Sequence, residues 1–478
     1  MTAGTSDAPA ASRVSALTLA GLVVGSMVGA GVFSLPGRFA AETGVWGALI
    51  AWAFAGGGML MLALVFHRLA LRRPELDAGV YSYARAGFGR YAGFFSAFGY
   101  WASACAGNVF YWVFITSTLG AVFPALGAGD TIVAVAVSSA GLWLFYLLIL
   151  TGAREAAAIN RIVSVAKVLP IIVFVLLCVV AFDPEVFAGN LTGGETAPVL
   201  YEQVRATLLV TVFAFIGVEG ASAYSRHARR RSDVGRATVL GFLSVLAVFM
   251  SVTIVSYGIL PREEIAELRQ PSMAGVLEAV VGGWGAVFVS VALVVAVLGA
   301  YLSWTLMAAE VLLVAARAGD LPRPFARTSD RDVPVGALTL STALVQVLLI
   351  VVLFSSDAFD VALNLTSALA LIPYFLTAAF ALKLALRDRE GIRRPRRIAD
   401  LAVAVVATVY TGFLLYAAGA EYTLVSLIII VPATVLYAVA RRRQCDRVFT
   451  SAEWIGFGLA AAGALVAIWL IATGLIAV

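Results

Sequence analysis

Long apolar stretches, separated by short polar segments, run through almost the whole of this sequence. An α-helix needs about 20 apolar residues to cross a bilayer. Thirteen stretches are long enough, and the segments between them are too short to form a folded domain. We therefore expect an all-α polytopic membrane protein whose function lies within the membrane. The predicted spans cover residues 15–41, 44–66, 90–122, 131–151, 160–182, 203–226, 237–260, 284–316, 335–355, 359–386, 400–418, 422–440 and 453–477.

Glycine interrupts two of these spans, the first and the sixth, which have opposite orientations. The first contains GSMVGAGVFSLP (25–36), and the sixth contains FAFIGVEGAS (213–222). Inside hydrocarbon every backbone N–H and C=O must be bonded, so a helix unwinds only where protein or a polar cavity accepts these groups. Paired interruptions in two halves of a chain are typical of secondary transporters built from inverted repeats, with the substrate bound at the breaks.

Composition and charge agree with this class and orient it. The 478 residues are 62% hydrophobic and 13% charged, with a mean hydropathy of +0.97, which excludes an ordinary soluble domain. The N-terminal tail and the loops after the even-numbered spans hold 28 of the 33 basic residues, and the opposite loops hold four. Basic loops stay in the cytoplasm. We expect a multi-pass protein of the plasma (inner) membrane, with its N-terminus in the cytoplasm and its C-terminus outside.

The first interrupted span offers backbone amides to a ligand. Unwinding there frees N–H groups at the start of the outer half-helix, where the helix dipole is positive and suits a carboxylate. The alternative is that Gly25 and Gly29 only allow close helix packing. The matching break in the sixth span favours a binding site, because carbonyls freed between Phe213 and Ile216 could accept from an ammonium group.

Two ionisable residues and one tryptophan lie inside predicted spans. Glu219 follows the sixth-span break, and an intramembrane carboxylate is by default functional; alternatively, it is a structural carboxylate bonded to amides in the unwound turn. Lys167 lies about 10 Å deep in the fifth span. It is either a functional cation or a side chain that snorkels to the interface. Trp304 is either a core residue or a surface for stacking on a planar or cationic side chain.

Other function classes find little support in the sequence. No nucleophile–base arrangement, phosphate loop or metal-ligand spacing occurs, so we expect no enzyme, no cofactor and no metal. Basic residues scattered over short loops suit anionic membrane lipids better than nucleic acid. The expected partners are a small amino acid substrate and membrane lipids, and a homodimer is compatible with the sequence. A nutrient sensor with a transporter fold is the alternative from another class.

Three motifs in the right order give the chain a resemblance to a known family. They are GSMVGAGVFSLP, FAFIGVEGAS followed by SRHARRRSDVGRATVLGF, and WTLMAAEVLLVAARAGDLPRPFAR. Over residues 15–440 the chain resembles the basic amino acid/polyamine antiporters of the amino acid–polyamine–organocation superfamily. It is most similar to the arginine/ornithine branch.

This resemblance implies a fold and a set of site residues. The fold is the inverted five-plus-five helix repeat transporter fold with about 13 transmembrane helices. After a cytoplasmic tail (1–14) come a first repeat (15–182, spans 1–5), a second repeat (203–386, spans 6–10) and peripheral spans 11–13 (400–478). The implied substrate-binding residues are Met27, Ala30, Gly31, Asn108, Phe213, Ile216, Trp304, Thr366 and Ser367. Lys167, in the place of a sodium ion, and Glu219, as a proximal gate, serve gating and coupling.

The implied activity is exchange of cationic amino acids (arginine, ornithine, lysine) by alternating access, without sodium. The alternative within the same class is a proton-coupled carrier for neutral or aromatic amino acids or amines. Phe213 and Ala214 depart from the tryptophan and serine of the arginine/agmatine branch, which also lacks the lysine of span 5. The lost hydroxyl at Ala214 weakens the case for guanidinium contacts, so lysine or ornithine is an alternative main substrate.

Overall fold

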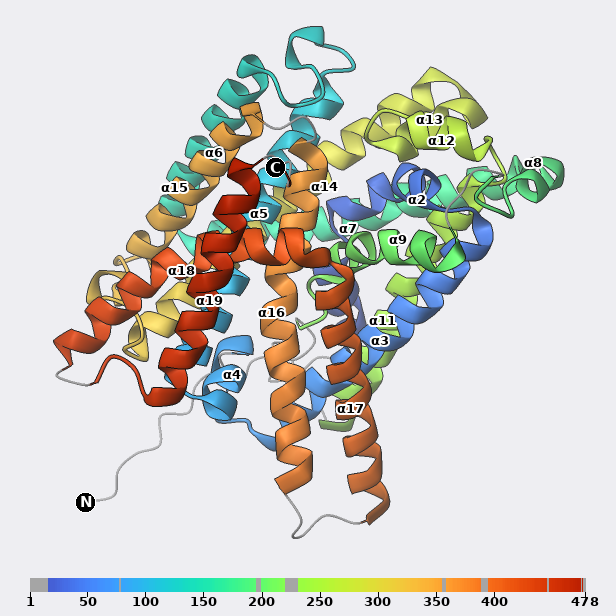
Figure 1. Cartoon of the computed structure of the whole chain (residues 1–478). Coiled ribbons are helices and arrows are strands. Elements are labelled where there is room, and N and C mark those ends of the chain that lie inside the picture. The colour runs from blue at the N-terminus through green and yellow to red at the C-terminus, as the bar shows by residue number, and fades with distance from the viewer. Residues whose placement is uncertain are drawn as a thin grey trace, which may run out of the picture.

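The computed structural model describes residues 16–76, 79–194, 199–219, 231–354, 358–387, 394–444, 447–473 and 475. Every regular element in these residues is a helix (Figure 1), which confirms the all-α class. In chain order the elements are α1 (Ala16–Met27), η1 (Ala30–Ser34), α2 (Leu35–Glu42), α3 (Val45–Arg72), α4 (Val80–Phe88), α5 (Arg90–Leu119), η2 (Pro124–Leu126), α6 (Ile132–Thr151), α7 (Ala153–Val180), α8 (Pro184–Gly189), α9 (Leu200–Phe215), α11 (Arg231–Ser256), α12 (Arg262–Glu267), α13 (Ser272–Val281), α14 (Gly283–Arg317), η4 (Arg323–Ala326), α15 (Val335–Val351), η5 (Val352–Phe354), α16 (Ala358–Arg387), α17 (Arg394–Ala417), α18 (Gly419–Arg443) and α19 (Ser451–Ala472).

Nine helices in the described part of the chain are long and apolar enough to cross a bilayer: α3, α6, α11 and α14 to α19. The four remaining predicted spans are not among these nine helices. The first and the sixth are interrupted, so neither contains one long helix. α5 has 30 residues but carries glycine, serine and asparagine. In α7 the described side chains begin at Lys167, and the stretch Lys167–Val180 is apolar. The count of thirteen spans stays a prediction.

Helix α5 lies at the centre of the bundle. It packs mainly against α16 and α14, and it also contacts α4, α15 and α18. Nearly all of its residues between Tyr91 and Thr118 are buried. A helix enclosed on all sides needs no lipid-facing stripe, so α5 can direct polar and small residues towards the protein interior. In contrast, the three buried residues of α19 are alanines, and this helix lies at the periphery beside α18.

The two ends of the bundle differ in structure and charge. One end carries the short helices α8, α12 and α13, and the other carries α4, the C-terminal end of α16 and the N-terminal end of α17 (Figure 1). Arg38 and Arg262 lie at the first end, which we call the arginine-poor end. Arg72, Arg387 and Arg441 lie at the second, which we call the arginine-rich end.

Candidate functional site

The helix of the first span is interrupted beside Gly29. α1 stops at Met27, and the amide of Val28 still donates to Val24 O at 2.8 Å. Gly29 then adopts extended backbone angles (φ −121°, ψ −155°), and the helix resumes as η1, which leads directly into α2. The first amides of a helix have no partner within it. Ala30 and Gly31 therefore begin a new half-helix in the protein interior, where both are buried.

The sixth span is interrupted at the end of α9. This helix stops at Phe215, and Ile216 leaves helical geometry at φ −58°, ψ 132°. Gly217 has φ +106°, a conformation that glycine adopts without steric cost. Turn-like bonds run from Ile216 N to Phe213 O (3.3 Å) and from Val218 N to Phe215 O (3.2 Å). The structure thus has a break in each of the two spans in which the sequence predicts one.

A narrow cavity lies between the two breaks. All the empty space in and around the cavity amounts to about 470 Å³. Only about 30 Å³ of it can be reached by the centre of a water molecule. The smaller value decides what fits, and one water needs roughly 10–15 Å³ on this measure. The cavity therefore holds a few waters in this conformation, and side chains must move before an amino acid enters. It is lined by Met27, Gly29, Ala30, Gly31, Val32, Ser103, Ala104, Gly107, Tyr111, Phe213, Ile216, Phe249, Trp304 and Thr366.

Seven of the nine predicted substrate-binding residues line this cavity: Met27, Ala30, Gly31, Phe213, Ile216, Trp304 and Thr366. The other two, Asn108 and Ser367, are buried but are not among the lining residues. Asn108 Nδ2 donates to Thr305 Oγ1 at 3.0 Å, and the Ser367 hydroxyl donates to Leu209 O at 2.9 Å. These bonds join α5 to α14 and α16 to α9, so both residues hold the helices that form the walls.

Seven lining residues are not among the predicted substrate-binding residues: Ser103, Gly107, Tyr111, Phe249, Gly29, Val32 and Ala104. The first three are four residues apart on α5 and share one face of that helix. The Ser103 hydroxyl donates to Thr366 O at 2.8 Å, which ties this face to α16. Small and polar residues repeated at this spacing are a signal that could have identified the face. Phe249 gives no such signal, because it is one apolar residue among many.

Glu219 lies in the turn after α9 and is held by three donors. The hydroxyls of Tyr100 and Tyr374 donate to its two carboxylate oxygens, the second at 2.6 Å, and the amide of Gly217 donates at 3.2 Å. The bond from the Gly217 amide is the contact expected if Glu219 is a structural carboxylate in the unwound turn. The two tyrosines come from other helices, α5 and α16. Glu219 does not line the cavity. It is one layer away, because the Tyr100 ring lies 6.2 Å from that of Trp304.

Lys167 is 4% exposed on α7, which packs against α14 and α11 and touches α1. It is therefore buried rather than snorkelling, and it lies on the helix that contacts both the first and the eighth span. It does not line the cavity. The hydroxyl of Ser303, an expected partner, donates to Gly299 O at 2.9 Å within α14. The bridging role of Lys167 stays a prediction.

Aromatic rings close the cavity towards the arginine-poor end. The ring of Phe213 lies 4.6 Å from that of Phe110, which lies 4.5 Å from that of Phe359. The Arg38 guanidinium covers the outer face of Phe359 at 4.9 Å and forms an ion pair with Asp360. A continuous stack thus leads from the cavity wall to a charged pair that joins α2 to α16.

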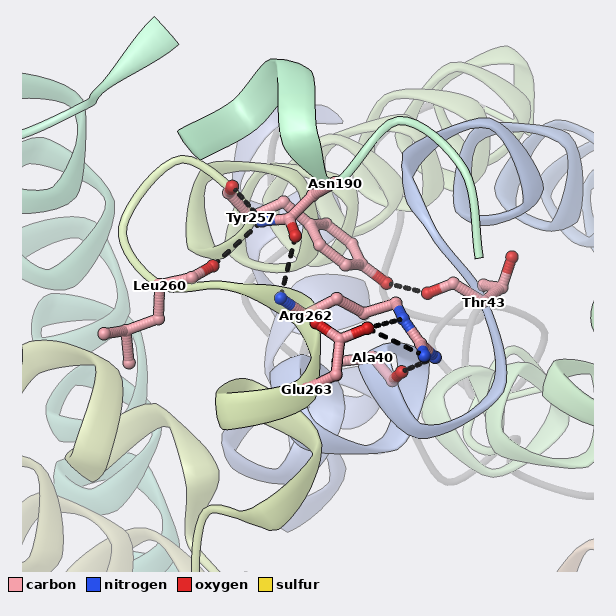
Figure 2. A network of polar contacts seen from close by, with 7 residues as sticks. All are labelled: Ala40, Thr43, Asn190, Tyr257, Leu260, Arg262 and Glu263. Atoms are coloured by element: carbon pink, nitrogen blue, oxygen red, sulfur yellow. Dashed lines mark hydrogen bonds and ion pairs between the residues drawn. The ribbon is translucent and has the colours of Figure 1, made fainter. Parts of the chain in front are cut away.

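A polar network fastens α2 to its neighbours at the same end, as Figure 2 shows. Its residues are Ala40, Thr43, Asn190, Tyr257, Leu260, Arg262 and Glu263. Asn190 Nδ2 donates to Tyr257 O and Leu260 O, and Asn190 Oδ1 accepts from the Arg262 amide at 2.7 Å. Arg262 Nη1 donates to Ala40 O at 3.0 Å, and the Tyr257 hydroxyl donates to Thr43 O at 2.7 Å. The half-helix that begins at the first break is therefore anchored at its far end.

A second polar cluster lies at the arginine-rich end. Asp320 is fully buried just after α14 and accepts a hydrogen bond from the Tyr81 hydroxyl at 2.7 Å. Arg85 Nε lies 3.4 Å from the same carboxylate oxygen. Burial raises the pKa of Asp320, and the Tyr81 hydrogen bond and the positive charge of Arg85 oppose that shift. These contacts tie α4 to the end of α14.

Comparison with known proteins places this geometry in a family. The amino acid permease family model matches residues 14–437, which include both breaks and every lining residue. The chain belongs to the amino acid permease family. It is 46% identical to the arginine/ornithine antiporter of Pseudomonas aeruginosa over 464 residues, which cover 95% of this chain and 96% of that protein.

Other relatives of this permease have related names. The L-lysine transport protein of Corynebacterium glutamicum is 39% identical, over 94% of each chain. The arginine/agmatine antiporter of Chlamydia abortus is 36% identical, over 96% of this chain and 97% of that protein. The chain is therefore a multi-pass membrane transporter of amino acids and not an enzyme, as the sequence predicts.

Proposed function

We propose that this permease exchanges cationic amino acids (arginine, ornithine and lysine) across the plasma membrane by alternating access and without sodium. The observation that carries the proposal is the cavity between two broken helices in a chain 46% identical to a protein named arginine/ornithine antiporter. Alternating access requires a site that can be closed on both sides. In this structure the aromatic stack and the cluster around Asp320 supply contacts for two such closures.

The cavity suggests how the common part of every amino acid would bind. The substrate carboxylate would accept from the amides of Ala30 and Gly31, at the positive end of the half-helix formed by η1 and α2. The α-ammonium would donate to carbonyls of Met27, Phe213 and Ile216, where the helices are broken. Trp304 and Thr366 would contact the side chain of the substrate.

We further propose two inverted repeats, 15–182 and 203–386, with the N-terminus in the cytoplasm and the C-terminus outside. The breaks lie at corresponding positions of these repeats, in α1–η1 and at the end of α9. In this orientation the outer segments hold thirteen acidic residues against four arginines. An acidic entrance raises the local concentration of cations and speeds their association.

Lys167 and Glu219 would couple the motions of the helices around the cavity. Lys167 is buried on α7, a helix that contacts both the first and the eighth span. Its ammonium would take the place of a bound cation, which is the basis for proposing exchange without sodium. Glu219, held by tyrosines of α5 and α16, would tie the second break to these helices on the arginine-rich side of the cavity.

One observation favours a second candidate, a carrier for neutral or aromatic amino acids. None of the fourteen described residues that line the cavity is charged, and four are aromatic: Tyr111, Phe213, Phe249 and Trp304. Such a wall suits an apolar side chain. It also attracts a cation through its ring faces, at about 0.5–2 kcal/mol per contact.

Counterflow in proteoliposomes discriminates between the two candidates. We expect unlabelled arginine, lysine or ornithine to drive uptake of labelled arginine in sodium-free buffer. Citrulline, a neutral isostere of arginine, should compete at least several-fold less well, given the cation–π estimate above. Equal competition by citrulline or leucine would reject the cationic class, and strong competition by tyrosine would favour the second candidate.

A further inference from the structure

A separate cavity of about 660 Å³ lies at the arginine-rich end, between α3, α11 and α17. These three helices lie side by side in the lower right of Figure 1. The cavity shares no lining residue with the candidate substrate site. It is lined by Leu64, His67, Arg68, Leu71, Arg72, Gly235, Arg236, Val239, Leu240, Ala399 and Asp400. Because this cavity lies at the outer edge of the bundle, it is not suited to the passage of substrate.

One carboxylate positions two arginines on the wall formed by α3. Arg68 lies 2.8 Å from Asp400, and Arg72, one helical turn later, forms an ion pair with the other oxygen of the same carboxylate. Arg68 also donates to Ala399 O at 2.9 Å. Asp400 is 8% exposed, so its charge is largely hidden behind the two guanidinium groups. The arginines are therefore held in place before any ligand arrives.

The opposite wall adds a third arginine. Arg236 is exposed on α11 and lines the cavity. The preceding residue is glycine, and a Cβ there would lie 2.9 Å from His67 Nε2. Gly235 thus lets α11 approach α3 closely and brings Arg236 to the rim. With three arginines and one carboxylate, the lining has a formal charge of +2 when His67 is neutral.

The remaining lining is apolar and continues onto the surface of membrane-spanning helices. Leu240 is 52% exposed, and Leu243, one turn further along α11, is also exposed. Both belong to a helix long and apolar enough to cross the bilayer. An inorganic anion would gain nothing from this apolar wall, and a soluble acidic peptide would not reach along it. Only a ligand with an anionic head and a hydrocarbon chain matches both parts.

We propose that this cavity binds an anionic phospholipid. The arginines hold its phosphate head group, and one acyl chain lies along Leu240 and the following turn of α11. Basic pockets between membrane helices on the cytoplasmic side are suited to such head groups. The site joins α3 to α17 through the Asp400 pairs and to α11 through the lipid.

The test uses the purified full-length protein and does not depend on the transported substrate. Phosphatidylglycerol and phosphatidylcholine are titrated separately, and binding is followed by native mass spectrometry and by thermal shift. We expect phosphatidylglycerol to bind and stabilise the protein, and phosphatidylcholine to do neither. A basic residue near an anionic lipid contributes about 1 kcal/mol of binding free energy, so Arg236→Gln should weaken phosphatidylglycerol binding about fivefold.

Arg327→Gln is the matched control, because Arg327 is exposed between η4 and α15 at the same end and lies outside the cavity. It should change affinity by less than about twofold. Equal losses for the two variants would mean nonspecific surface attraction and would overturn the proposal. So would equal stabilisation by inorganic phosphate alone. Leu240→Ser should weaken phosphatidylglycerol binding, and an unchanged affinity would overturn the acyl-chain placement.

Discussion

The methyl group of an alanine at position 31 tests whether the first break is the substrate site. A Cβ built on Gly31 lies 3.0 and 3.1 Å from two ring carbons of Phe213, where ordinary contacts begin near 3.4 Å. The ring would have to retreat by a few tenths of an ångström. Its retreat is resisted, because its other neighbour, the Phe110 ring, is 4.6 Å away and packs in turn on Phe359.

The size of the effect follows from this crowding. Forcing an extra methyl group into a packed interior costs about 1–3 kcal/mol. If the methyl group also occupies the space that the substrate carboxylate needs, the same amount is lost from binding, which is roughly 5- to 150-fold in affinity. We therefore expect Gly31→Ala to bind arginine at least fivefold more weakly, and to lose a few degrees of melting temperature.

Gly29→Ala is the matched control, because Gly29 also lines the cavity. A Cβ there would meet only the Tyr111 hydroxyl, at an ordinary 3.6 Å, and the extended backbone of Gly29 accepts any residue. Its affinity should stay within about twofold of wild type. In Gly31→Ala, the further change Phe213→Leu should recover part of the lost stability, since residues in contact do not act additively.

Equilibrium binding of labelled arginine and ligand-induced thermal shift, both on purified protein, measure these effects. A folded Gly31→Ala protein with wild-type affinity would refute the placement of the site. Equal losses in Gly29→Ala and Gly31→Ala would show that glycine flexibility, and not space for a carboxylate, is what matters.

Three further predictions concern residues around the cavity. Lys167→Met should lose most exchange in proteoliposomes while the protein keeps its melting temperature, because methionine fills a similar buried volume; wild-type exchange that required sodium would contradict the role of this cation. Arg38→Gln removes the ion pair with Asp360, so amides of η1 should exchange hydrogen several-fold faster by mass spectrometry, and unchanged rates would exclude the pair from the closure. The raised pKa of Asp320 means that the folded state binds its proton more tightly than the unfolded state, so this group's contribution to stability falls as pH rises through the raised pKa. Asp320→Asn should therefore melt with a weaker pH dependence than wild type, and identical slopes would contradict this.

The helix breaks could be predicted because their cause is local in sequence. Gly217, at φ +106°, permits the second interruption, and glycines cluster around both interruptions in the sequence. Unbonded backbone is costly in hydrocarbon, which makes such clusters informative. The directions of Asn108 and Ser367 could not be predicted. Asn108 lies beside the small and polar face of α5, on a helix that is buried on all sides, so its side chain could serve packing against α14 as well as the cavity.

The surroundings of Glu219 could not be predicted either, because its partners are distant in sequence. Tyr100 is 119 residues away and Tyr374 is 155. Each tyrosine looks like an ordinary aromatic residue of a membrane span. Only the packing of α5 and α16 beside the second break brings the two hydroxyls to one carboxylate.

The separation between the cavity and this carboxylate bears on how a cationic side chain is recognised. The breaks can bind the parts that all amino acids share. None of the described lining residues is charged, so the lining distinguishes arginine from citrulline only through its ring faces. The carboxylate of Glu219 is separated from the cavity by the Tyr100 and Trp304 rings and accepts hydrogen bonds from two tyrosine hydroxyls. We expect a substrate cation to reach it when Trp304 moves and the cation takes the place of one tyrosine hydroxyl. Charge recognition would then be made in the same step that loosens α5 or α16 from the second break. In such a protein a cationic substrate lowers the barrier to the conformational change, and a neutral isostere binds the breaks without doing so. We therefore expect citrulline to differ from arginine more in the rate of exchange than in affinity, and equal exchange rates at saturation would argue against this coupling.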